Sequence, residues 1–252
     1  MRKSTIALIL VLNIFFSFGQ DMNNKNLKVI TNFIECIKSQ NKESLSNMIS
    51  FPLQREYPIP EIRNKQEFLK RYNEIFDDHL IKMILKSKPT KDWSVMGWHG
   101  LMLLDGQVWL DFNGKLIGVN YQTNFEERKL KELIDSDKNS LYESIKVFKL
   151  PICVLETSRY RIRIDILGNN KYRYASWSLK SKMSDKPDMI IQNGEFVPDG
   201  SGGNHSYVFK NANFVYECGI IEMGEDNSPP AYLTVSKGDK VILSQDAKII
   251  IK

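Results

Sequence analysis

The sequence predicts an α+β domain followed by an all-β domain, and three observations support this order. Apolar residues recur at helical spacing up to about residue 86, and strand-like runs separated by glycine or asparagine turns follow them. The chain has 252 residues, enough for two domains of roughly 100 to 130 residues each. A hydrophobic content of 42% with 26% charged residues is typical of a globular chain and excludes a disordered or multispanning one.

The first 20 residues are predicted to be a secretory signal peptide. Two basic residues open the chain, an apolar run follows at 6–16, and Ser17 and Gly19 supply small residues before a cut near Gly19/Gln20. The apolar run is shorter than the roughly 20 residues that a membrane-spanning helix needs. We therefore expect an exported protein, periplasmic or secreted, with no membrane span.

Neither a nucleic-acid partner nor a cofactor is predicted from the charge of the chain and its possible metal ligands. The net charge of the whole chain is +5, and loss of Arg2 and Lys3 with the signal peptide lowers it to +3. Such a balance lacks the concentrated basic surface that nucleic-acid binding requires. The three histidines and three cysteines do not cluster, so no metal site is expected.

Four helices are predicted before residue 90. The apolar residues from Leu27 onward recur every three or four positions. The third helix has the clearest start, because Asn64 is followed three residues later by Glu67 in a capping box. Prolines exclude a regular helix between residues 51 and 62. The predicted helical segments are 27–37, 41–50, 64–76 and 78–86.

An antiparallel three-stranded meander is predicted next. Asp105-Gly106 and Asn113-Gly114 are dipeptides that supply the positive φ angles of tight hairpins. They separate β-rich runs at 101–104, 107–112 and 115–121. Helices followed by a sheet that they can cover form an α+β architecture with one core.

The second domain is predicted to be a small β-barrel or sandwich. The charged segment Glu126–Asp137 leads to the boundary, so the two domains are 21–137 and 138–252. Downstream runs alternate in polarity and end at glycine or asparagine turns, which is typical of these all-β folds. The predicted strands are 159–167, 171–179, 189–197, 205–210, 214–223, 231–236, 241–244 and 247–251.

The first hairpin of this domain has a predicted register. With Gly168-Asn169-Asn170 as its loop, Asp165 lies opposite Arg173 and Arg161 opposite Trp177. The other face of the hairpin is expected to form core. Alternation also places Arg159, Arg161 and Arg163 on one face. With Lys171 and Arg173 they form a basic row, which we interpret as a solvated face rather than as a site for an anionic polymer.

The order of elements over residues 24–125 resembles the nuclear transport factor 2-like (SnoaL-like) superfamily. The resemblance rests on the helices, the Phe51-Pro52-Leu53 segment, the third helix, the run Trp98-His99-Gly100-Leu101-Met102-Leu103 and the two glycine hairpins. It implies a curved sheet wrapped by helices into a cone around an apolar pocket. Members include isomerases, dehydratases, polyketide cyclases and exported binding domains.

The resemblance implies pocket residues in the first domain. Tyr72, Trp98, His99 and Trp109 are the expected lining of a small-molecule site. In the enzymes of that superfamily an Asp, His or Tyr moves a proton, and the matching candidates are His99, Asp78 and Tyr72. We expect a binding protein, and an isomerase or dehydratase that uses His99 is the rival hypothesis.

The second domain offers one candidate loop and one candidate disulfide. The glycine-rich stretch 198–205 is usually a surface turn, but its Asp199, Asn204 and His205 are the candidates for binding a protein or glycan. Cys153 and Cys218 are expected to pair, which would close a loop of about 65 residues and stabilise the fold by roughly 4 kcal/mol. The layout resembles small exported barrels that inhibit lysozyme, which makes inhibition of a cell-wall hydrolase a second rival.

Overall fold

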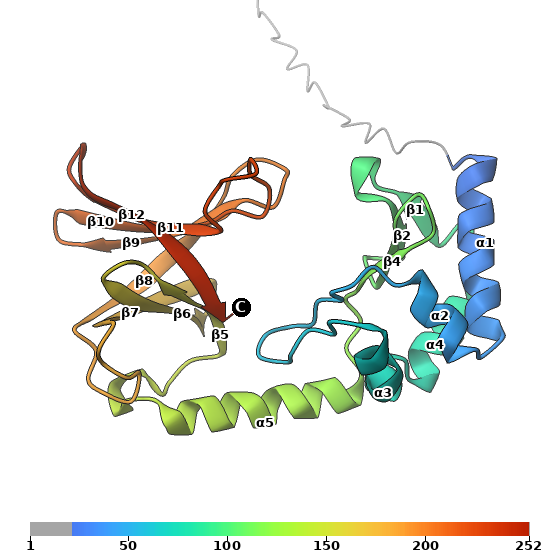
Figure 1. Cartoon of the computed structure of the whole chain (residues 1–252), viewed down its shortest axis with the longest axis horizontal. Coiled ribbons are helices and arrows are strands. Elements are labelled where there is room, and N and C mark those ends of the chain that lie inside the picture. The colour runs from blue at the N-terminus through green and yellow to red at the C-terminus, as the bar shows by residue number, and fades with distance from the viewer. Residues whose placement is uncertain (1–21, 252) are drawn as a thin grey trace, which may run out of the picture. The chain divides into compact units, whose positions relative to one another are not determined.

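The computed structural model describes residues 22–251, and the predicted signal peptide lies outside this range. The chain divides into two compact units. The first comprises the described residues up to Gln54 together with Ile62–Tyr121, and the second comprises Arg55–Glu61 with Gln122 onward. Figure 1 labels most of the helices and strands of both. No helix among the described residues is long and apolar enough to cross a membrane.

The described part of the first unit contains four α-helices, and the starts of two of them confirm the capping chemistry predicted from the sequence. The Asn41 side chain accepts a hydrogen bond from the Ser44 amide at 2.9 Å, and Asn64 accepts one from the Glu67 amide at 3.0 Å. The helices are α1 (Asn24–Lys38), α2 (Lys42–Met48), α3 (Lys65–Ile75) and α4 (Asp78–Lys86).

A four-stranded antiparallel sheet completes the first unit. Gly106 and Gly114 have φ angles of 93° and 88°, so both predicted glycine turns are confirmed. The sheet has one strand more than predicted, because β1 is three residues long and too short to show a period. The strands are β1 (Trp93–Val95), β2 (Leu101–Leu103), β3 (Val108–Leu110) and β4 (Leu116–Val119), in that spatial order.

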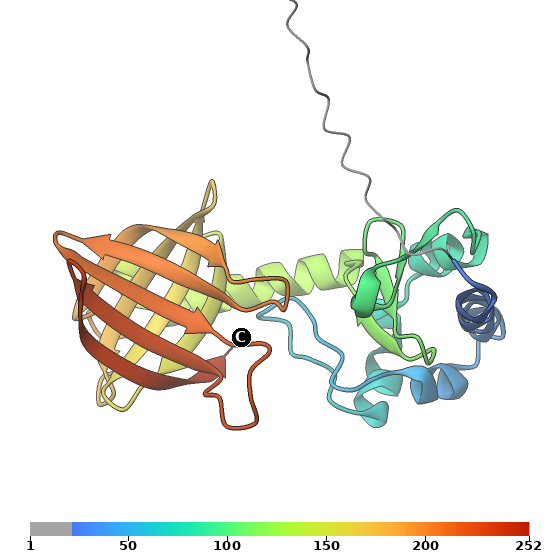
Figure 2. The ribbon, with the colours of Figure 1, turned by 90° about the horizontal axis from the view of Figure 1, so that it is seen from above.

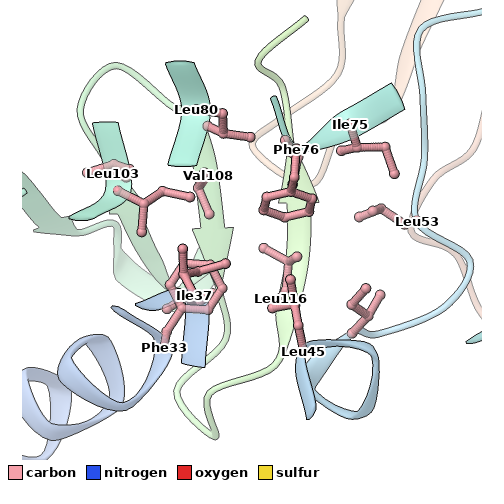
Figure 3. Close-up of a cluster of buried hydrophobic side chains, with 14 of the residues drawn as sticks. Phe33, Ile37, Leu45, Leu53, Ile75, Phe76, Leu80, Leu103, Val108 and Leu116 are labelled. Atoms are coloured by element: carbon pink, nitrogen blue, oxygen red, sulfur yellow. The ribbon is translucent and has the colours of Figure 1, made fainter. Parts of the chain in front are cut away.

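Helices and sheet enclose one apolar core in the first unit. Phe33 of α1 meets the ring of Trp93 edge to face, with centroids 6.1 Å apart. Leu103, Val108 and Leu116 extend from the sheet into the same cluster, as Figure 3 shows. These side chains occupy the space between the helices and the sheet.

The second unit is a closed eight-stranded antiparallel barrel preceded by helix α5 (Asn124–Ser140). Each strand pairs with the next along the chain and the last pairs with the first, which makes an up-and-down barrel (Figure 2). Of the two predicted all-β forms, the barrel is therefore the observed one. The strands are β5 (Leu150–Glu156), β6 (Tyr160–Gly168), β7 (Lys171–Ser178), β8 (Met189–Pro198), β9 (His205–Asn211), β10 (Phe214–Ile220), β11 (Ala231–Lys237) and β12 (Lys240–Ile251).

Two strand predictions for the barrel were wrong. The runs 241–244 and 247–251 form one continuous strand, β12. Strand β5 was missed, because Pro151 stands near its start and proline is unfavourable inside a sheet. The structure accommodates Pro151 beside a β-bulge, where the ladder between β5 and β6 shifts its register.

The predicted register of the β6–β7 hairpin is confirmed, but the interpretation of its outer face as solvated is wrong. Asp165 pairs with Arg173, and Arg161 pairs with Trp177. Apolar residues of α5 and the segment after it pack on this outer face, forming a cluster of Ile134, Leu141, Ile145, Phe148, Ala175 and Trp177. Arg163 and Arg173 are therefore buried.

The buried arginines are paired with carboxylates in an ionic network beneath α5. The Arg163 guanidinium lies 2.8 Å from Asp165 Oδ1 and 2.5 Å from Asp137 Oδ2, the latter on α5. Arg173 Nη2 lies 2.5 Å from Asp165 Oδ2 and also donates to the Ile145 carbonyl at 2.7 Å. Buried charges need such partners. Arg163 and Arg173 thus have a structural role, while Arg159 of the same row is exposed.

Residues 55–61 belong to the barrel unit although the residues on both sides of them belong to the first unit. Arg55 forms a bidentate ion pair with Glu126 in the first turn of α5, and both side chains are almost fully buried. Burial and the nearby Asp137 carboxylate raise the pKa of Tyr57 to about 12. Helix α5 and the 55–61 segment therefore belong to the barrel unit. The predicted boundary at residue 137 placed the segment and most of the helix in the first domain.

Candidate ligand-binding site in the barrel lumen

Tyr72, predicted to line a pocket in the first unit, lies in the packed core. Its ring stacks on Phe76 with centroids 5.3 Å apart and meets Phe68 edge to face. Lys42 Nζ lies 4.3 Å from the ring centroid. Burial raises the pKa of the Tyr72 hydroxyl. A neutral phenol held between aromatic rings is a packing residue in this arrangement.

The other predicted proton-transfer residues lie at the surface, away from that core. Trp98 is 61% exposed, and its ring stacks on the exposed His99 with centroids 3.7 Å apart. Both belong to a short 3-10 helix at 97–99. Asp78 is exposed in the first turn of α4. The structure therefore does not bring His99, Asp78 and Tyr72 into one site.

Trp109 points away from the core of the first unit. On β3 the neighbouring Val108 and Leu110 are buried, whereas Trp109 is half-buried on the opposite face. Its indole nitrogen donates a hydrogen bond to the Gly106 carbonyl at 3.0 Å. This contact fixes the hairpin, and it gives Trp109 a structural role instead of the expected place in a pocket.

The loop residues predicted in the second domain do meet. Asp199, Asn204 and His205 line one pocket of about 300 Å³, which also includes Glu217 and Tyr232. The Tyr232 hydroxyl donates to Glu217 Oε1 at 2.9 Å. Burial and this hydrogen bond raise the pKa of Tyr232 to about 12.

Asn204 has a structural part in that pocket rather than the expected contact with a ligand. Its side-chain oxygen accepts hydrogen bonds from the amides of Glu222 and Met223, at 2.8 and 2.9 Å. Its nitrogen donates to the Met223 carbonyl at 2.8 Å. These bonds tie two loops together, while a protein or glycan partner for the loops stays a prediction.

The predicted Cys153–Cys218 disulfide is not present in the structure, where both residues are buried thiols. They lie on β5 and β10, and β11 and β12 separate these strands around the barrel. A disulfide joins Cα atoms about 4.4 to 6.8 Å apart. Neighbouring strands alone lie about 4.8 Å apart, so strands three spacings apart are too far from each other for this bond. Both side chains face the lumen and belong to its core.

A thiol titration tests whether Cys153 and Cys218 are free thiols. We expect three reactive thiols per chain in denaturant without reductant, because Cys36, Cys153 and Cys218 are all present as thiols. In the folded protein near neutral pH, Cys36 should react first, since it is half-buried while Cys153 and Cys218 are buried. One reactive thiol in denaturant would restore the predicted disulfide.

A second pocket, which the sequence did not predict, opens at one end of the barrel lumen. It has a volume of about 250 Å³. Three tyrosine rings contribute to its wall together with the apolar side chains of β11 and β12. We call it the lumen pocket, and its lining residues are Tyr160, Tyr174, Ser176, Asp188, Met189, Tyr216, Leu233, Val235, Ile242 and Leu243.

Strand alternation and barrel closure place these side chains together. Tyr216 pairs with Val235, which pairs with Leu243, so one row of inward side chains crosses β10, β11 and β12. Tyr174 of β7 approaches Tyr216 with ring centroids 5.7 Å apart. The sequence indicated the inward face of Tyr174, but its meeting with Tyr216 depends on the closure of the barrel.

Phe209 packs against Tyr174, one of the tyrosines that line this pocket. Its ring centroid lies 5.5 Å from that of Tyr174. It is seated on Gly194 of β8, where an added Cβ would come within 2.2 Å of the Phe209 ring. Because glycine has no side chain, it leaves room for the Phe209 ring at this position.

Burial keeps two titratable groups of the lumen in their neutral forms. Burial raises the pKa of the Cys218 thiol well above its usual range, and burial likewise raises that of the Tyr174 phenol. A thiol that stays protonated is a poor nucleophile. Among the described residues, no group of three or more His, Cys, Asp or Glu side chains is arranged to hold a metal ion.

Comparison with known proteins gives no relative. No family model, curated protein or solved structure matches the chain. The two family resemblances therefore stay predictions.

Proposed function

We propose that the chain is an exported binding protein whose barrel takes a small apolar molecule into the lumen pocket. The observation that carries this proposal is the pocket of about 250 Å³ between Tyr174, Tyr216 and the apolar residues of β11 and β12. Ligand sites are typically concave, mostly apolar and supplied with a few fixed polar groups. Eight-stranded up-and-down barrels have an interior of the size that holds one small ligand.

The proposal moves the expected small-molecule site from the first unit to the barrel. The first unit has the order of helices and meander on which the superfamily resemblance rests. We propose that this unit belongs to that superfamily and that its sheet curves into a cone. Its interior side chains pack closely, and Trp98 and Trp109 lie outside that core. We assign the ligand to the barrel because the lumen pocket is lined mostly by apolar and tyrosine side chains, whereas the pocket of about 260 Å³ beside α1 and α2 in the first unit is lined largely by polar residues.

Filling the lumen pocket should abolish ligand binding. The full chain is titrated with N-phenyl-1-naphthylamine, an uncharged apolar dye whose fluorescence rises when it leaves water. In Leu233→Trp, the indole projects into the pocket, and we expect the affinity to fall at least tenfold. Thr234→Trp is the matched control, because Thr234 follows Leu233 on β11 and faces the outside of the barrel.

Two results would contradict the proposal. The dye could fail to bind the unsubstituted chain, or it could bind Leu233→Trp as tightly as the control. Circular dichroism of both variants shows whether the barrel has folded. Leu233→Phe adds less volume and serves where the tryptophan variant unfolds.

A further inference from the structure

The lumen contains a polar atom that the protein itself leaves unsatisfied. Gln245 Oε1 is buried and has no hydrogen-bond partner among the described residues. Gln245 lies on β12 directly opposite Leu233, which lines the lumen pocket, and two residues from Leu243, which also lines it. Its neighbours two residues away in either direction, Leu243 and Ala247, both pack into the lumen core, so Gln245 faces inward as well.

A buried carbonyl without a donor is unfavourable, and a ligand that supplies the donor recovers this loss. The row of inward residues Tyr207, Cys218, Leu233 and Gln245 lies one step deeper than the row of Tyr216, Val235 and Leu243. A ligand that enters the pocket with its polar end first therefore brings that end towards Gln245.

The other groups of the pocket disfavour an anionic ligand. Among the described residues that line it, none is lysine or arginine, and Asp188 contributes a carboxylate. The Asp188 side chain accepts a hydrogen bond from the Ser178 amide at 2.8 Å, so it is held in place. A ligand carboxylate would enter an apolar lumen without a partner of opposite charge.

We propose that the lumen ligand is an uncharged apolar molecule with a hydroxyl, or another hydrogen-bond donor, that binds Gln245 Oε1. Long-chain or cyclic alcohols belong to this class, whereas fatty acids and pure hydrocarbons do not. This inference rests on the proposed function, because it concerns the same pocket.

A matched series of eight-carbon probes tests the inference by calorimetric titration of the full chain. The probes are 1-octanol, heptyl methyl ether, which lacks the donor, and octanoate, which is anionic. We expect 1-octanol to bind roughly three- to tenfold more tightly than the ether, the advantage of one hydrogen bond. Octanoate should bind more weakly than both.

Substitution of the acceptor should remove this preference. Gln245→Met keeps the side-chain length but has no amide, so 1-octanol should lose its advantage while the ether binds as before. Ser244→Met is the matched control, because Ser244 is the exposed neighbour on the same strand. It should leave both affinities unchanged.

The outcomes separate this inference from the proposed function. Equal binding of alcohol and ether, or tightest binding of octanoate, would overturn the inference and leave the lumen site standing. A preference for the alcohol that persists in Gln245→Met would also overturn it. Failure of all three probes to bind, together with failure of the naphthylamine dye, would overturn the proposed function itself.

Discussion

Replacing Asp165 with alanine is expected to lower the free energy of unfolding by about 3 to 5 kcal/mol, the usual cost of removing one partner from a buried ion pair. Asp165 is fully buried, and it accepts from Arg163 at 2.8 Å and from Arg173 at 2.5 Å. Without it both guanidinium groups stay under α5. Arg163 keeps Asp137, whereas Arg173 keeps the carbonyls of Ile145 and Val147 but no carboxylate.

Loss of Asp165 should affect Arg173 more than Arg163. Its Nε is already buried without a hydrogen-bond partner. Loss of Asp165 would therefore leave a charge with incomplete hydrogen bonding in a dry environment, which is the situation that proteins avoid. Asp165→Asn should cost less than Asp165→Ala, because the amide oxygen can still accept from one arginine.

Urea unfolding followed by circular dichroism measures this effect. The matched control is Glu156→Ala, because Glu156 pairs with Arg161 beside the same hairpin at 2.7 Å, with both side chains about one quarter exposed. A partly exposed pair of this kind contributes less than about 1 kcal/mol. Equal losses in Asp165→Ala and Glu156→Ala would show that the network is not the stabilising element that its burial indicates.

Local chemistry explains what the sequence could predict. The starts of α2 and α3 follow from Asn41 and Asn64, because a cap and the amide that it binds are three residues apart. The β6–β7 register follows from alternation and from the turn at 168–170. These signals lie within a few residues of one another in the chain, so no knowledge of distant segments is needed to interpret them.

The candidate site was missed because it depends on distant segments. Tyr160, Tyr174 and Tyr216 stand on three different strands, and barrel closure decides that they share one end of the lumen. The same dependence explains the arginine row. Alternation shows correctly that Arg163 faces outward, but α5 covers this outer face, and nothing near Arg163 in the sequence indicates that.

Arg55 is expected to be as important for the barrel unit as Asp165, although it lies about 70 residues earlier in the chain than its partner Glu126. The exposed fractions of the two side chains are 3% and 1%. Thr123 caps α5 by accepting from the Glu126 amide at 3.1 Å, so the carboxylate is fixed in the first turn of the helix. Arg55→Ala would leave that carboxylate buried without its guanidinium.

We expect Arg55→Ala to lower the free energy of unfolding by about 3 to 5 kcal/mol, whereas Arg63→Ala, which breaks an exposed pair with Glu67, should cost less than about 1 kcal/mol. A double-mutant cycle identifies the cause. The cycle uses Arg55→Met, Glu126→Leu and the two combined. If each single loss comes from an unpaired buried charge, the double variant should recover most of it, because an apolar pair can replace a buried ion pair. Additive losses would instead mean that Arg55 acts through other contacts of the 55–61 segment. Recovery would establish that this segment is held to the barrel unit through α5, and that Arg55 and Glu126 act as one element of its stability.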